Sequence, residues 1–131
     1  MKLCIAIAVA IAILLLPNFY QGYSDTTLEI KIIDSSCALI KNVGKSNAIN
    51  VSWEMWVDCS ILFIAPPKQN GSIALLKPNE EKLICYEKSS FIFGFGLLKL
   101  KAMAKADNAK IVEDEKIIGI LIGSFAIIFK V

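Results

Sequence analysis

The chain has 131 residues, of which 56% are hydrophobic and 20% charged, and its formal net charge is +2. One domain is the most that this length accommodates once a leader is set aside. Lysines and acidic residues are interspersed and arginine is absent, which excludes a basic nucleic-acid-binding protein. Histidine is absent too, and with it the commonest general base and metal ligand. We therefore expect neither an enzyme nor a metal or cofactor site.

The first 24 residues have the pattern of a targeting segment. Lys2 precedes the apolar run Leu3–Leu16, which has the length of a signal-peptide core and is short for a membrane span of about 20 residues. Pro17 then interrupts any helix. Cleavage after Ser24 would make Asp25 the mature start, and the alternative is an uncleaved hydrophobic helix that anchors the chain through residues 3–16. Both interpretations predict an extracytoplasmic domain, secreted or anchored to the cell membrane.

From Thr27 onward the hydrophobic period changes to two, which indicates β-strands. In the first expected strand, Leu28, Ile30 and Ile32 alternate with Glu29 and Lys31, so one face is apolar. Ala48–Val57 is the clearest strand, and we expect one of its faces to pack in the core through Ile49, Val51, Trp53, Met55 and Val57. Its other face is polar except for Trp56, which is the candidate partner surface.

The other expected strands are short and separated by turn formers: Cys37–Val43, Ile61–Ala65, Ser72–Leu76, Lys82–Tyr86, Leu98–Ala106 and Ile111–Lys116. Asn70-Gly71 is a strong hairpin signal and predicts a turn. Leu98–Ala106 permits a helix, but its near-perfect alternation favours a strand, with Leu100 in the core. Seven to eight strands predict an all-β antiparallel sandwich over residues 25–131, preceded by an N-terminal hydrophobic helix over residues 1–24.

The run Ile117–Val131 is the most apolar segment after the leader. As a strand it would be covered on both faces, and Phe125 would join the core. As a helix it would pair Gly119 with Gly123 in a GxxxG motif, but about 13 apolar residues give only roughly 20 Å of helix against a hydrocarbon core of about 30 Å. We favour the strand, which Gly123-Ser124 could bend or turn into a hairpin. The alternatives are a strand donated to a neighbouring subunit and a short membrane helix.

Cysteines and glycosylation sequons supply candidate covalent sites. Cys37 and Cys85 lie on strands that such a sandwich places in one sheet, so they are the candidate disulfide, with Cys59 left over. The alternative is that these cysteines stay free and buried as small hydrophobes. Asn70 and Asn50 begin the two sequons, and Asn70, on an expected loop tip, is the better acceptor.

Acidic residues offer weak candidate sites. Glu113-Asp114-Glu115 together with Asp107 has oxygen ligands for calcium but matches no EF-hand spacing, so a solvated acidic turn is expected. Glu54 and Asp58 share a polar strand face, where carboxylates are ordinarily solvated rather than paired across a catalytic cleft.

Three stretches, IKNVGKSNAINVSWEMWVD, GSIALLKPNEE and LKAMAKADNAKIVEDE, carry a family resemblance. They resemble the CARDB group of adhesion-related immunoglobulin-like domains of prokaryotic surface proteins, over about residues 28–115. The positions that match its turn motifs are Asn42, Gly44, Ala48, Leu76, Pro78, Glu80, Asp107, Asn108, Glu113 and Glu115. Asn79 stands where glycine is usual, and the paired asparagines after the last glutamate are missing. The resemblance implies an extracellular immunoglobulin-like sandwich without catalytic residues.

The function that these observations predict is a non-catalytic module for binding, adhesion or scaffolding at the cell surface, either exported or membrane-anchored. The partner would be a protein or a surface glycan, and the chain could also self-associate through Ile117–Val131. One alternative is a filament or pilus subunit that assembles by strand donation. Another is an accessory membrane protein with a second, C-terminal span.

Overall fold

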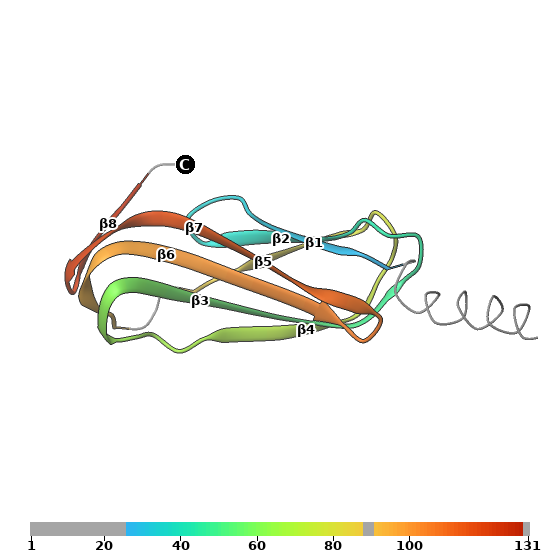
Figure 1. Cartoon of the computed structure of the whole chain (residues 1–131), viewed down its shortest axis with the longest axis horizontal. Helices are drawn as coiled ribbons and strands as arrows, with labels where there is room; N and C mark the ends of the chain where they lie inside the picture. Colours follow the sequence, from blue (N-terminus) through green and yellow to red (C-terminus); the bar gives the residue numbers. More distant parts are fainter. Residues whose placement is uncertain (1–25, 88–90, 130–131) are drawn as a thin grey trace, which may run out of the picture.

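The computed structural model describes residues 26–87 and 91–129, and within them the chain is all-β, with two antiparallel sheets (Figure 1). The three-stranded sheet has the order β1-β2-β5 and the five-stranded sheet the order β4-β3-β6-β7-β8. The strands are β1 (Leu28–Ile32), β2 (Cys37–Asn42), β3 (Ala48–Ile64), β4 (Gln69–Leu76), β5 (Glu81–Cys85), β6 (Phe93–Ala106), β7 (Ala109–Gly123) and β8 (Phe125–Ile128). The predicted leader helix, membrane anchor and cleavage site lie outside the described residues.

The core lies between the two sheets and follows the predicted alternation. Of the residues expected there, Val51, Met55 and Leu100 have no exposed surface and Ile30 is 7% exposed. Trp53 is half-buried and packs against this core. Because β1, β2 and β5 have five or six residues and β3, β6 and β7 have 14 to 17, the smaller sheet covers only part of the larger one.

Strand β3 corrects two predictions. Ala48–Val57 and Ile61–Ala65 were expected as separate strands, but one continuous strand runs from Ala48 to Ile64. Its pairing with β6 is irregular at Ser60 and at Phe63. Ile49 was expected in the core but is 46% exposed. The cause is Asn50, whose φ of 52° breaks the alternation, so Ile49 and Val51 do not share a face. The strand predicted at Leu98–Ala106 is confirmed and forms the second part of β6.

The turn predicted at Asn70-Gly71 is wrong, because both residues lie inside β4. The chain turns earlier, where Pro66-Pro67 cannot donate ladder hydrogen bonds. Gly71 is instead required by packing. It is the register partner of Trp53, and a Cβ at this position would lie 2.5 Å from Cζ2 of the indole.

The apolar C-terminal run forms a hairpin rather than a single strand. Its first part is the end of β7, residues 123–124 turn the chain, and β8 returns along β7. Among the described residues, no helix has the length and hydrophobicity to cross a membrane. Phe125 was expected in the core but is 67% exposed, because β8 is the edge strand and this side chain lies on the sheet face that the smaller sheet does not cover.

Cys37 and Cys85 are register partners on β2 and β5 and form a disulfide, while Cys59 is the free cysteine among the described residues. The bond joins two cysteines that are 48 residues apart in the sequence and so closes a long loop. By the chain-entropy relation, we expect the double variant Cys37→Ser/Cys85→Ser to lose about 4 kcal/mol of unfolding free energy. Urea titration of the non-reduced proteins measures this loss. Cys59→Ser is the control, and an equal loss in that variant would contradict a specific role for the bond.

Candidate functional site

The outer face of the five-stranded sheet, which turns away from the smaller sheet, carries cross-strand rows of large apolar side chains. In the first row Ile61, Phe95, Ile122 and Phe125 are successive register partners on β3, β6, β7 and β8. Their side chains are 42–67% exposed. The next row joins Leu97 on β6 to β7 and β8; its members on those strands are Ile120 and Ile127. Apolar side chains directly opposite each other on four strands form a continuous surface.

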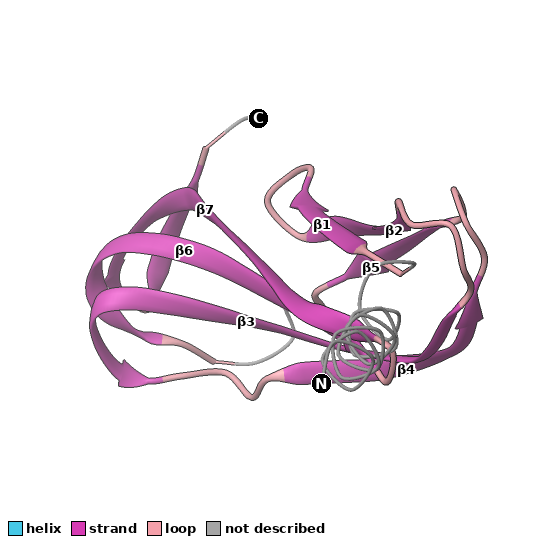
Figure 2. Cartoon of the chain, turned by 45° about the vertical axis from the view of Figure 1, so that its right-hand side comes forward, coloured by secondary structure: helices cyan, strands magenta, loops and turns pink. Residues whose placement is uncertain are grey.

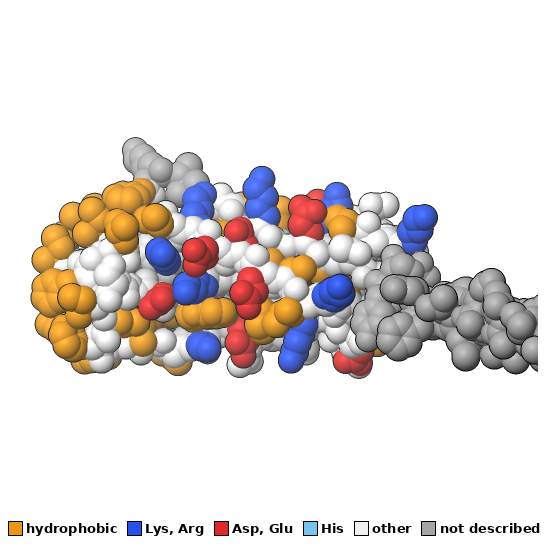
Figure 3. Space-filling view, viewed as in Figure 1, with side chains coloured by type: hydrophobic (Ala, Val, Ile, Leu, Met, Phe, Trp, Pro, Cys, Tyr) orange, Lys and Arg blue, Asp and Glu red, His pale blue; other side chains and the backbone are white. Residues whose placement is uncertain are grey.

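We call the end of the molecule that carries these rows the apolar tip. Its exposed large side chains are Ile61, Phe63, Ile64, Phe91, Phe95, Leu97, Ile117, Ile122, Phe125, Ile127, Ile128 and Phe129. Figure 3 shows hydrophobic side chains covering this rounded end, on the left, while charged side chains lie over the rest of the face. Residues 59–67, 91–98 and 117–129, which build the tip, contain no charged residue. A contiguous exposed apolar surface of this kind marks an interaction site.

The tip is convex because the long strands bend together at this end (Figure 2). The pairing of β3 with β6 and of β6 with β7 is irregular here, and such bulges bend strands and increase their twist. Gly96 adopts a φ of +118°, which a residue with a side chain rarely adopts. At Gly119 a Cβ would collide with the backbone oxygen of Ile127. The irregular pairing therefore bends the sheet, and the glycines leave room for the close approach of neighbouring strands.

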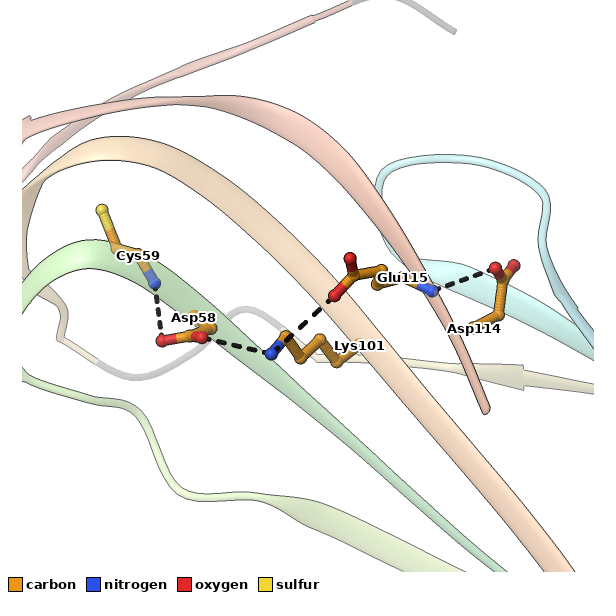
Figure 4. Close-up of polar contacts among 5 residues, drawn as sticks. All are labelled: Asp58, Cys59, Lys101, Asp114 and Glu115. Carbon is orange, nitrogen blue, oxygen red and sulfur yellow. Dashed lines mark hydrogen bonds and ion pairs between the residues drawn. The ribbon is translucent and has the colours of Figure 1, made fainter. Parts of the chain in front are cut away.

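A row of charged residues borders the tip on the outer face (Figure 4). The ammonium of Lys101 lies 3.3 Å from Oδ2 of Asp58 and 3.8 Å from Oε2 of Glu115. The backbone N–H of Cys59 donates a 2.9 Å hydrogen bond to Oδ1 of Asp58. This bond, followed by the lysine, lowers the pKa of the Asp58 carboxyl from its ordinary value of 3.8. This row therefore marks the boundary between the charged and the uncharged parts of the outer sheet face.

The lowered pKa of Asp58 predicts a pH effect. The ionised carboxylate stabilises the fold above pH 3.8, and this contribution is lost as the pH falls through the lowered pKa of the folded chain. Asp58→Asn should therefore be less stable at neutral pH and lose less stability on acidification below that value. Thermal unfolding at several pH values measures this. Glu115→Gln, whose contact with Lys101 is longer, is the control, and equal pH profiles for Asp58→Asn and the parent chain would contradict the prediction.

Trp56, the predicted partner surface, lies on the outer face beside this charged row. It is half-buried, and the ammonium of Lys68 lies 4.8 Å from the centroid of its ring. A hollow of about 330 Å³ lies beside it, lined also by Lys101 and Glu115. Trp56 therefore lies among charged residues, one cross-strand row farther from the apolar tip than Asp58.

The acidic residues weighed for calcium do not converge. Oδ2 of Asp114 accepts a 2.8 Å hydrogen bond from the backbone N–H of Ile32, which joins the two sheets. Asp107 lies at the β6–β7 turn and accepts a 2.7 Å hydrogen bond from the Asn50 amide. Within residues 26–87 and 91–129, no group of three or more Cys, Asp or Glu side chains is placed to hold a metal ion.

The two sequons lie in different settings. Asn70 is exposed on the edge strand β4, not on the expected loop tip. The Asn50 side chain is engaged with Asp107, so a glycan there would replace that hydrogen bond. Asn70 is accordingly the more accessible of the two.

An apolar groove of about 210 Å³ continues from the tip toward the interior. Its lining includes Val57, Tyr86, Leu98, Ile118, Ala126 and Ile128. The hydroxyl of Tyr86, which lines this groove, donates a 3.2 Å hydrogen bond to the carbonyl of Pro67. Sequence reasoning nominated one segment of the tip, Ile117–Val131, as a surface for self-association, but it identified neither the groove nor the joining of three segments in one tip. The available signal was the lack of charge in three segments that are far apart in the chain but adjacent in the sheet.

Comparisons with protein-family models, curated proteins and solved structures found no match to this chain. The resemblance to CARDB domains therefore stays a prediction from the motifs. One of those motifs has a clear structural role, because Asn42 is fully buried and its side chain closes the β2–β3 loop.

Proposed function

We propose that this chain is a non-catalytic, exported β-sandwich of the immunoglobulin-like kind that binds a partner at the cell surface through its apolar tip. The observation that carries the proposal is the tip itself, an uncharged, convex surface four strands wide. Leaving so many large apolar side chains in water is unfavourable, so a covering partner stabilises the arrangement. The disulfide supports an oxidising location outside the cytoplasm.

The test uses the full chain expressed in cells. A membrane-impermeant amine reagent should label it on intact cells, because many of its lysines are exposed. A photo-crosslinking phenylalanine analogue at Phe125 should form adducts, whereas the same analogue at Ile111, at the opposite end of β7, should not. Failure of surface labelling, or a tip that gives no adducts in labelled cells, would overturn the proposal.

Ile122 and Ile111 offer a matched pair for this test. Both lie on β7 and both are 54% exposed, but only Ile122 belongs to the tip. We expect Ile122→Ser to reduce the yield of adducts from the analogue at Phe125 by several-fold and Ile111→Ser to leave it unchanged. Equal yields in the two variants would contradict binding through the tip.

A filament subunit is the second candidate, and the exposed edge of β8 favours it. This strand is four residues long and apolar, and its outer edge is unpaired within the described part of the chain. Donation to a neighbour would require β8 to leave β7. Sedimentation of the purified chain distinguishes the candidates, because a filament subunit forms large particles with rising concentration and a binding module stays monodisperse.

A further inference from the structure

We propose that the partner of the apolar tip is a lipid bilayer, into which the tip inserts at the boundary between headgroups and acyl chains. This inference rests on the proposed function, since it names what the tip binds. The chemistry of the surface supports it first. A protein interface carries hydrogen-bonding groups among its apolar contacts, whereas the tip rows consist of Ile, Leu and Phe alone.

The shape of the tip favours lipid over a second copy of this chain. The long strands bend at this end, and hydrophobic side chains cover the rounded surface (Figures 2 and 3). The exposed side chains of Phe63, Phe91 and Phe129 belong to the segments that build it. Two rigid convex ends would touch over a small area and leave most of these side chains in water. A fluid bilayer surrounds a rounded end from every side and covers all of them.

The border of the tip contains a tryptophan and lysines beside the carboxylates of Asp58 and Glu115. Trp56 lies in the row next to Asp58, with the ammonium of Lys68 over its ring. Lys99 is the register partner of Asp58 and lies two residues from Leu97 of the tip. Tryptophan and lysine are the residues that concentrate at headgroup level, where an apolar body and a polar end are both accommodated.

The edge of β8 limits how deep the tip can go. Backbone groups without partners are not tolerated in the hydrocarbon core, so an open sheet edge excludes a spanning position. Insertion by about 5–10 Å, as amphipathic surfaces achieve, covers the apolar side chains while water and headgroups still reach this edge.

The test places an environment-sensitive fluorophore at a single introduced cysteine in the full chain. Ser124→Cys lies in the β7–β8 turn of the tip, and Lys110→Cys lies at the opposite end of β7. Cys4→Ser and Cys59→Ser remove the thiols that would otherwise be labelled. The chain is first reconstituted into vesicles of phosphatidylcholine with a minority of phosphatidylglycerol that contain no quencher. Vesicles of the same lipid mixture, but with brominated acyl chains, are then added.

We expect the label at position 124 to brighten several-fold and to be quenched more by bromine near the headgroup than by bromine near the bilayer centre. The label at position 110 should not change. Ile122→Ser should weaken the response of the label at 124, and Ile111→Ser should not. Labels at 124 and 110 that respond equally would overturn the inference, because binding would not be specific to the tip.

Two other outcomes would also overturn it and would identify a different occupant. A label at 124 that stays aqueous with vesicles, while the Phe125 crosslinker forms protein adducts in cells, would leave the proposed function standing and replace lipid with a protein. Lipid-free disulfide dimers through the cysteine at 124 would assign the tip to a second copy. Loss of surface labelling in cells is the distinct result that removes the proposed function.

Discussion

Leu100→Ala lowers the free energy of unfolding by about 2–5 kcal/mol, the range for a fully buried leucine that leaves a cavity. Leu100 has no exposed surface and lies in the middle of β6. It faces the smaller sheet, and its register partner on β3 is the buried Val57. Urea unfolding followed by tryptophan fluorescence measures the change, since Trp53 and Trp56 both lie on β3 near this site.

Leu97→Ala is the matched control for this prediction. Leu97 lies on the same strand but on the outer face, where it is 44% exposed. Its removal should change stability by no more than about 0.5 kcal/mol and instead weaken binding at the tip. An equal loss of stability in the two variants would show that the outer face is covered within the folded chain, which would contradict the apolar tip.

Asn42→Ala should cost about 3 kcal/mol or more, because it removes one buried and two partly buried hydrogen bonds to the backbone. The Asn42 side chain is fully buried. Its Nδ2 donates to the carbonyl oxygens of Ser46 at 2.8 Å and Leu76 at 2.9 Å, and its Oδ1 accepts from the N–H of Gly44 at 2.9 Å. One amide thus connects β2, the β2–β3 loop and the end of β4. The same urea titration measures the loss.

Two further variants sharpen this prediction. Asn70→Ala removes an exposed asparagine on β4 and should be nearly neutral. Asn42→Asp keeps the size of the side chain but replaces the donors with a carboxylate next to two carbonyl oxygens, so it should be at least as destabilising as alanine at neutral pH. Full stability in Asn42→Asp would show that the two donated bonds contribute nothing.

Periodicity predicted the parts of the fold where pairing is regular. The alternation in β1 and in Leu98–Ala106 matches the buried and exposed faces of those strands. It failed at Ile49, because one residue with positive φ moves a side chain to the other face without any change in hydrophobicity. The turn predicted at Asn70-Gly71 was wrong because the glycine lies inside a strand, where its lack of a side chain leaves room for the Trp53 indole.

The full extent of the apolar tip was not predictable from a pattern of hydrophobicity, because an apolar residue in a strand is ordinarily assigned to a core. Phe125 is the example, since its exposure depends on which strand lies at the edge and on how far the smaller sheet reaches. Both are properties of the whole topology. The two cysteines nominated for a disulfide were easier, because they required only that two strands share one sheet, and the structure makes them direct partners.

The described chain begins at the end of the sandwich opposite the tip, and this separation gives the molecule two poles. The Thr26 hydroxyl accepts a 3.1 Å hydrogen bond from the Asn108 amide at the β6–β7 turn, while the same two strands run from that turn to the tip. With about 3.3 Å per residue, the 14 residues of β6 span roughly 45 Å along a straight path. The proposed membrane-binding tip and the N-terminal end of the described chain are therefore separated by about the length of these two strands.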